Sequence, residues 1–175
     1  MILSLFRKNP AREPVYGIYR AIVAQSRQPR FYSELGVPDT VTGRFDMISL
    51  HLGLLFHRLR GEGPAARDFS QALFDLFFRD MDRSLREMGA GDLSVPKKIR
   101  TMTQAFYGLL YALAAALDGD DAGALEALLV RNVYAGSEAP GARELADYLR
   151  TEVARLSRAS AGDLIAGHLG LEQVA

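Results

Sequence analysis

Acidic side chains gather on the segment 64–88, where they could form a hydrolytic or metal-binding cluster. They are Asp75, Asp80, Asp82 and Glu87. Three of the four have an arginine three or four residues further along the chain, as Asp82 has in Arg86. Side chains at those separations are neighbours on a helix surface. We therefore expect surface ion pairs here, and not a catalytic site.

Histidine, the other residue type with acid–base and metal chemistry, occurs three times, as His51, His57 and His168. His51 and His57 are six residues apart, which separates them by about 240° around a helix, so they do not share a face. The Glu-x-x-His step of helical di-iron bundles is absent. Residue type alone leaves haem ligation by His51 or His57 open. We expect no bound metal and no cofactor.

Other signs of enzymatic chemistry are missing. The chain has no cysteine, which excludes thiol catalysis, disulfides and thiolate zinc sites. It has no glycine-rich phosphate loop and no Gly-x-Ser-x-Gly turn. Basic and acidic residues both total 21, so no global charge excess marks a DNA-binding protein. We expect a protein that is not an enzyme and has no small-molecule substrate.

The charge is unevenly distributed along the chain. Residues 1–60 carry nine basic and four acidic side chains, a net charge of +5 that the remainder balances. Such a segment suits an anionic surface, although the fold could pair these charges internally. Residues 1–12 begin with an apolar stretch followed by Arg7 and Lys8, an order opposite to that of a secretory signal. We expect residues 1–12 to form a mobile or membrane-surface segment of a protein without a membrane-spanning run.

Helical periodicity dominates residues 13–175, which predicts an all-α fold with a single compact domain of six or seven helices. The expected helices cover 14–28, 42–59, 64–88, 94–117, 121–134 and 140–156, with a last short one capped by Ser160. We expect an ordered loop over 30–39 that presses its apolar side chains onto the core. The segment 94–117 is so apolar that it is expected to be the central helix.

Two polar stretches lie at expected helix starts. In the first, residues 36–46, Asp39 or Thr42 is expected to cap a helix and Arg44 to bind a carboxylate. In the second, Asp92 or Ser94 is expected to cap the next helix. Lys97 and Lys98 follow in its first turn, where the helix dipole disfavours cations. They therefore face either an anionic partner or a local carboxylate such as Glu87 or Asp92.

These stretches form part of a longer series of short motifs. In chain order they are Val37-Pro38-Asp39-Thr40, Gly43-Arg44-Phe45-Asp46, His51, Leu73-Phe74-Asp75, Asp80-Met81-Asp82, Leu85-Arg86-Glu87, Gly91-Asp92, Val95-Pro96-Lys97-Lys98 and Ala105-Phe106-Tyr107-Gly108. Their order and spacing resemble the ubiquinol-cytochrome c chaperone family over residues 14–134. Without a mitochondrial targeting extension, the chain looks like a bacterial relative of the mitochondrial cytochrome b assembly chaperone.

The resemblance implies a non-catalytic helical protein that assists early assembly of the respiratory cytochrome bc1 complex. Its implied partner is cytochrome b or the nascent cytochrome b chain, with the ribosome or a membrane surface as further contacts. Such a protein is expected in the cytoplasm, peripheral at the inner face of the cytoplasmic membrane. The alternative is a helical carrier of haem or another small hydrophobic ligand that uses His51, His57 or Tyr107.

Polar residues of the shared motifs are the candidate partner-binding residues. They are Arg44, Asp46, His51, Asp75, Asp82, Arg86, Glu87, Asp92, Lys97 and Lys98. Each of them could instead hold the helices in register, so the sequence defines a candidate region and leaves the role of each residue open.

Overall fold

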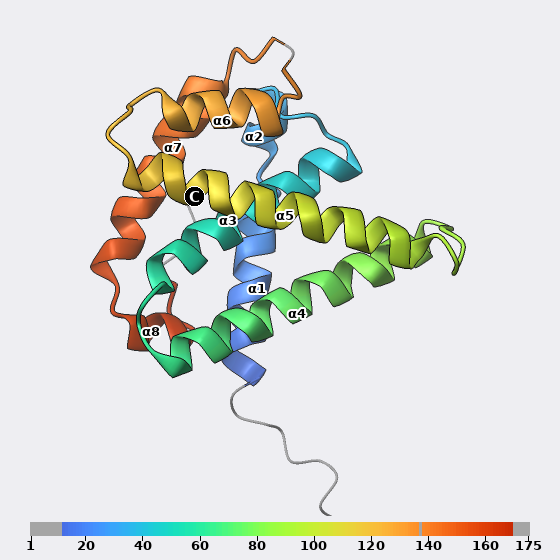
Figure 1. The fold of residues 1–175 in the computed structure, drawn as a ribbon, viewed down its shortest axis with the longest axis horizontal. Helices are drawn as coiled ribbons and strands as arrows, with labels where there is room; N and C mark the ends of the chain where they lie inside the picture. The colour runs from blue at the N-terminus through green and yellow to red at the C-terminus, as the bar shows by residue number, and fades with distance from the viewer. Residues whose placement is uncertain (1–11, 137, 170–175) are drawn as a thin grey trace, which may run out of the picture.

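The computed structural model describes residues 12–136 and 138–169, and this part of the chain contains eight α-helices and no β-strand (Figure 1). They are α1 (Arg12–Ser26), α2 (Pro29–Ser33), α3 (Val41–Leu59), α4 (Pro64–Glu87), α5 (Val95–Asp118), α6 (Ala124–Asn132), α7 (Ala142–Arg158) and α8 (Ala161–Ile165). The predicted all-α single domain is confirmed. The segment 1–12, predicted to be mobile or at a membrane surface, lies outside the described residues except for the start of α1.

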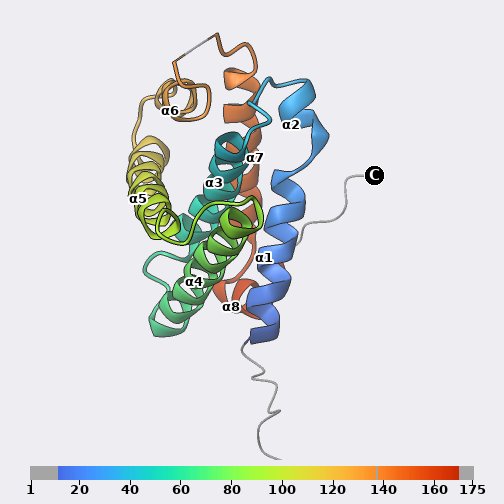
Figure 2. The ribbon, with the colours of Figure 1, turned by 90° about the vertical axis from the view of Figure 1, so that its right-hand side faces the viewer.

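Helix α3 is the central helix, and the prediction that 94–117 would be central is wrong. Most of α3 is buried, and it packs against α1, α4, α5 and α7. Figure 2 shows α5 at one side of the molecule and α1 at the other, with α3 between them. Only Val95, Phe106, Leu109 and Leu113 of α5 are buried. Helix α5 is therefore apolar but covered on one side only.

The helices α3 and α5 approach each other closely at Gly53. A Cβ atom on Gly53 would lie 2.7 Å from Leu113 Cδ2 and 3.0 Å from Leu110 Cδ2. The absence of a side chain thus lets the two leucines of α5 lie directly on the α3 backbone. This contact fixes which side of α5 faces the core.

A short helix lies inside the segment that was predicted to be a loop. Pro29 ends α1 as expected but also begins α2, because proline is well suited to the first turn of a helix. Phe31 of α2 and Leu35 and Val37 after it are all buried in the core. The prediction that this segment presses apolar side chains onto the core is therefore confirmed, and its description as a loop throughout is wrong.

The start of α3 is capped by Thr40, and not by Asp39 or Thr42 as predicted. Thr40 Oγ1 accepts a hydrogen bond from the Gly43 backbone N–H at 3.1 Å. This arrangement brings Gly43 against the preceding loop, where a Cβ atom would lie 2.0 Å from the Pro38 carbonyl oxygen. Gly43 is consequently required for the tight entry of the chain into the central helix.

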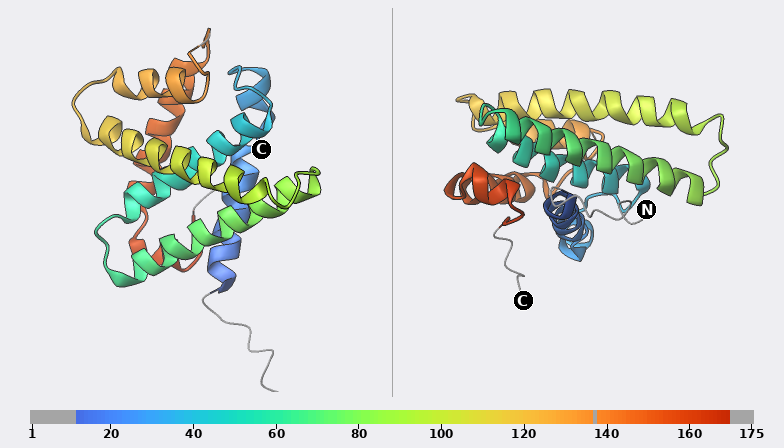
Figure 3. Two further views of the ribbon diagram at one scale, coloured as in Figure 1. Left: turned by 45° about the vertical axis from the view of Figure 1, so that its right-hand side comes forward. Right: turned by 90° about the horizontal axis from the view of Figure 1, so that it is seen from below.

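Helices α4 and α5 form a long antiparallel hairpin whose far end, residues 79–100, we call the arm. The arm extends past the other helices, and both views of Figure 3 show the two helices running together to their turn. The turn has the Schellman pattern: the N–H groups of Ala90 and Gly89 donate to the carbonyls of Leu85 and Arg86, and Gly89 has a φ of 85°. Leu85 and Val95 are buried in the arm, yet they lie outside the contiguous core cluster.

The remaining helices close the other side of the domain. Helix α6 packs against α5 and α7, and α8 packs against α4. Ser160 caps α8 as predicted, because its Oγ accepts from the Asp163 N–H at 3.0 Å. Helix α7 thus completes the cover of the central helix.

The tight entry into α3 predicts opposite effects for one substitution at two glycines. Gly43→Ala should lower the free energy of unfolding by about 3 kcal/mol, because its Cβ meets a backbone oxygen that cannot move away easily. Gly108→Ala, where a Cβ atom meets nothing within 4 Å, should instead raise it by up to about 1 kcal/mol through helix propensity. Urea unfolding followed by circular dichroism measures both, and equal effects would contradict the steric account.

Candidate functional site

The structure separates the ten candidate residues into an arm group and four others. The arm group comprises Asp82, Arg86, Glu87, Asp92, Lys97 and Lys98. Arg44 and Asp46 lie in the first turns of α3, and Asp75 lies midway along α4. His51 is buried in the core at 6% exposure. The motifs therefore do not converge on one pocket.

Ion pairs tie the carboxylates of the arm to two arginines. Arg86 binds Asp82 at 2.7 Å and also reaches Asp92 across the turn. Its hydrogen bond holds the pKa of Asp82 below the usual range. Arg83 binds Asp80 at 2.8 Å and lies 3.8 Å from Glu87. These pairs hold the end of the hairpin together.

Two of the three ion pairs predicted along α4 are confirmed, those of Asp80 with Arg83 and of Asp82 with Arg86. The third differs, because Asp75 accepts a hydrogen bond from Gln71 Nε2 at 2.8 Å in place of one from Arg79. Helical spacing allows both neighbours of Asp75, and the structure selects the amide one turn earlier. The carboxylates of α4 are thus held by neighbouring side chains, and Asp80 also accepts a hydrogen bond from the Tyr19 hydroxyl of α1 at 2.9 Å.

The first turn of α5 lacks the cap that was predicted. Ser94 occupies the N-cap position, but its hydroxyl donates to the Gly91 carbonyl at 2.8 Å and makes no cap hydrogen bond. Asp92 is engaged with Arg86. Lys97 and Lys98 are exposed and have no acidic partner within residues 12–136 and 138–169. The predicted alternative of local pairing with Glu87 or Asp92 is therefore not found in the described residues.

His51 forms a buried hydrogen-bond network that joins α1, α3 and α7. Its Nδ1 donates to the Met47 carbonyl at 2.7 Å, and Ser26 Oγ lies 3.2 Å from the same nitrogen. Its Nε2 accepts from the Tyr148 hydroxyl at 2.8 Å, which in turn accepts from Gln25 Nε2 at 2.9 Å. This network fixes one neutral tautomer. Burial lowers the pKa of His51 and keeps the ring neutral.

Both ring nitrogens of His51 are therefore occupied by the protein, and a structural role fits this residue better than a partner contact. His57 donates to Asp118 Oδ1 at 2.8 Å. Within the described parts of the chain, no group of three or more histidine, cysteine, aspartate or glutamate side chains is arranged to hold a metal ion. Haem ligation by His51 would require the loss of one of its hydrogen bonds.

Asp46 is the most unusual charged group among the candidates. Its side chain is partly buried beside the second turn of α3, and this burial raises its pKa to about 7. No hydrogen bond or ion pair to this carboxylate occurs in the described residues. A carboxyl group with a perturbed pKa and no internal partner is a candidate contact for a cation or a donor on another molecule.

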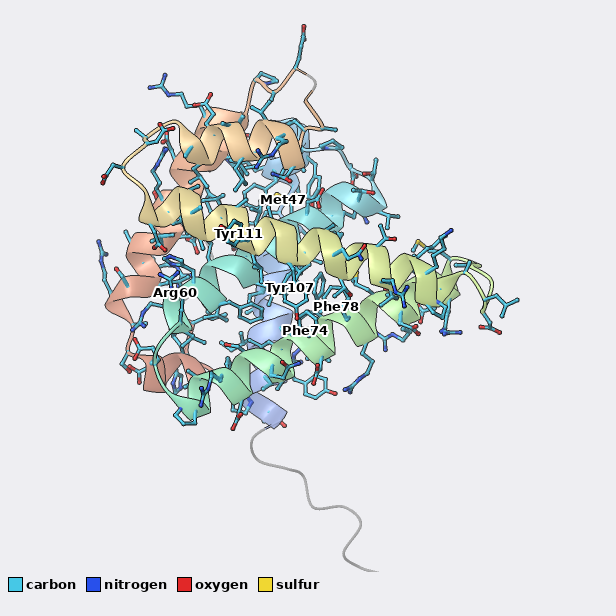
Figure 4. All side chains as sticks on the ribbon, viewed as in Figure 1. Met47, Arg60, Phe74, Phe78, Tyr107 and Tyr111 are labelled. Atoms are coloured by element: carbon cyan, nitrogen blue, oxygen red, sulfur yellow. The ribbon has the colours of Figure 1, made fainter. Side chains whose placement is uncertain are left out.

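One side of α5 forms a broad uncharged surface, which we call the open face. Its exposed residues are Thr101, Gln104, Ala105, Tyr107, Gly108, Tyr111 and Ala115. Tyr107 is 56% and Tyr111 is 83% exposed. No acidic or basic residue occurs from 101 to 117. Figure 4 shows Tyr111 over α5 and Tyr107 between α5 and α4.

A groove lies beside the open face, where the end of α3 meets α4 and α5. Its volume is about 480 Å³. Phe74 and Tyr107 line it with their ring centroids 5.6 Å apart, and Phe74 continues inward to Phe106 at 5.7 Å. Arg60 lies at the rim and binds both carboxylate oxygens of Asp118, at 3.0 and 3.2 Å. An aromatic path thus connects the core to the surface next to Tyr107 (Figure 4).

The open face was not predicted from the sequence, because this helix was expected in the centre. A signal was nevertheless present, because Gln104, Gly108, Tyr111 and Ala115 recur at steps of three and four residues opposite the large leucines. None of the described helices is both long and apolar enough to cross a membrane.

The fold and this surface define an all-α domain that exposes one uncharged helix face, a class suited to binding other proteins. A family model described as ubiquinol-cytochrome C chaperone matches residues 33–171. The chain therefore belongs to the ubiquinol-cytochrome C chaperone family, as the order of its motifs predicted.

Similar proteins agree with this family. The crystal structure of the Cbp3 homolog from Brucella abortus is 44% identical, with a TM-score of 0.83, and the match covers 95% of this chain and 94% of that one. Ubiquinol-cytochrome-c reductase complex assembly factor 1 of Xenopus laevis is 25% identical over 85% of this chain and 74% of its own length. The Homo sapiens protein is 24% identical, and the chain spans about 50% of its length.

The burial of Asp46 predicts a defined pH dependence of stability. Because the folded protein keeps this carboxyl protonated up to about pH 7 while the unfolded chain loses the proton near pH 4, stability should fall as pH rises between these values. Asp46→Asn should therefore be more stable than the unchanged protein by about 2 to 4 kcal/mol at pH 8. The difference should nearly vanish at pH 4. Urea unfolding at both pH values tests this, and a gap that does not change with pH would contradict it.

Proposed function

We propose that this protein is an assembly chaperone that binds newly made cytochrome b and assists early assembly of the respiratory cytochrome bc1 complex. Its membership of the ubiquinol-cytochrome C chaperone family supports the general role. The names of its curated relatives, which are assembly factors of the ubiquinol-cytochrome-c reductase complex, support the choice of complex. Such a role requires a binding surface and no reaction centre.

The observation that carries the proposal is the open face of α5. The uncharged stretch 101–117 measures about 25 Å along the helix, close to the roughly 30 Å of a bilayer hydrocarbon core. A membrane subunit that has not yet assembled exposes apolar helices of that length. An uncharged helix face can cover such a helix without burying unpaired charge. We therefore propose a transmembrane segment of cytochrome b as the occupant.

The shape of the open face supports close packing of a client helix. Ala105, Gly108 and Ala115 are small, and a Cβ atom at Gly108 would meet no other atom within 4 Å. Small residues allow two helix backbones to approach each other, as they do in membranes. Tyr107 and Tyr111 add large rings with a polar edge, the type of side chain enriched where proteins bind each other.

Polar groups on α3 and α4 are further proposed contacts. Arg44 and Asp75 are exposed, and Asp46 has a partly buried carboxylate without a partner in the described chain. They suit charged loops that flank a transmembrane segment. The alternative function, a carrier of haem or another small ligand, is less well supported, because His51 and His57 are engaged within the fold.

Filling the space at Gly108 tests the client surface. Gly108→Leu should fold at least as stably as the unchanged protein, since leucine favours helix more than glycine does. It should nevertheless recover about tenfold less cytochrome b, because the added side chain keeps the client helix at a distance. The measurement is a pulldown of the tagged protein from membranes of its host during respiratory growth.

The matched control is Gly17→Leu on α1, where a Cβ atom also meets nothing within 4 Å. This variant changes helix propensity equally but leaves the open face untouched, so cytochrome b recovery should not change. Equal recovery by both variants would overturn the placement of the site on α5. Failure of the unchanged protein to recover cytochrome b would overturn the proposed client itself.

A further inference from the structure

The side chain of Leu93, at the end of the arm, is almost completely exposed to solvent. Leu93 is 98% exposed and Met88, on the other side of the same turn, is 57% exposed. Leu93 has the largest exposed fraction among the exposed large hydrophobic residues of the described chain. The turn that carries them is the part of the hairpin farthest from the other helices (Figures 1 and 3). An apolar side chain is thus held where a flat surface could reach it without touching the rest of the protein.

Unpaired positive charge follows this leucine in the chain. Each of the four carboxylates of the arm has an arginine partner, Asp80 and Glu87 in Arg83, and Asp82 and Asp92 in Arg86. The cations that follow Leu93 have no acidic partner in the described parts of the chain; they are Lys97, Lys98 and Arg100. The uncompensated charge next to the exposed leucine is therefore positive.

We propose that the tip of the arm docks on an anionic lipid surface, with Leu93 in the interfacial layer and Lys97 and Lys98 at the headgroups. The turn is convex, which suits a bilayer surface better than it suits a client segment that needs a groove. Lysine side chains are long enough to keep their ammonium groups in the headgroup layer while a neighbouring apolar residue enters below them. Negative lipid headgroups match the uncompensated charge.

Such a contact is weak and reversible. Each cation close to an anionic membrane surface strengthens binding by about fivefold, and full burial of one leucine side chain adds on the order of tenfold. The tip alone would therefore hold the protein transiently at the membrane. This inference goes beyond the proposed client, because it concerns lipid and does not depend on which protein the open face binds.

Tryptophan fluorescence tests insertion of the tip directly, because the chain contains no tryptophan. The full-length Leu93→Trp variant is mixed with vesicles of phosphatidylcholine alone or of an equimolar mixture with phosphatidylglycerol. We expect a blue shift of the emission, and quenching by brominated lipid chains, with the mixed vesicles only. A matched Tyr111→Trp variant, with its probe on the open face, should show neither effect.

Removal of the two lysine charges gives a second, independent test. Lys97→Gln combined with Lys98→Gln should weaken binding to the mixed vesicles by about 30-fold in sedimentation. The control pair Arg143→Gln with Arg158→Gln removes two exposed cations from α7 and should leave binding nearly unchanged. Vesicle binding without a change in the emission of the Leu93→Trp variant, or equal losses in the two double variants, would overturn the proposal. So would an emission shift of the Leu93→Trp variant that requires ribosomes or another protein and does not occur with vesicles.

Discussion

Helix α3 presents apolar side chains around most of its circumference, and the positions of the other helices follow from the need to cover it. Four helices pack directly on it, and Gly53 lets α5 lie close against its backbone. Because α3 takes up the central position, α5 can contact the core along one side only. The uncharged face that we assign to client binding is thus a direct result of which helix occupies the centre.

A buried polar network stabilises the same centre without introducing a charge. The neutral ring of His51 connects Met47 on its own helix to Tyr148 on α7, and Ser26 of α1 lies beside it. A fully hydrogen-bonded network of this kind specifies how three helices fit together, whereas an all-apolar contact would tolerate sliding. Asp46 is the contrasting case on the same helix, since its burial is not balanced by any internal partner in the described chain.

Helix positions could be predicted from the sequence because their signals are local. Pro64, Gly89 and Ser160 mark helix ends by their own backbone preferences, and the pair of Asp82 and Arg86 follows from helical spacing. Which helix is central depends on packing and could not be predicted by counting apolar residues. Alanine, glycine and tyrosine make α5 apolar overall yet tolerate exposure, whereas α3 is buried although it includes His51 and Asp46. The ion pair of Arg86 with Asp92 could not be predicted either, because it depends on the path of the chain through the turn.

Helix α5 is a single uninterrupted rod of about 36 Å, from the lysines at its first turn to Asp118 at its end. Lys97, Lys98 and the open face therefore lie on one helix and cannot reorient independently. If the tip rests on a bilayer, the tilt of this rod determines the angle at which the open face meets a segment that emerges from the same membrane. The length and straightness of α5 would then determine the angle and the height above the membrane at which the client segment is bound.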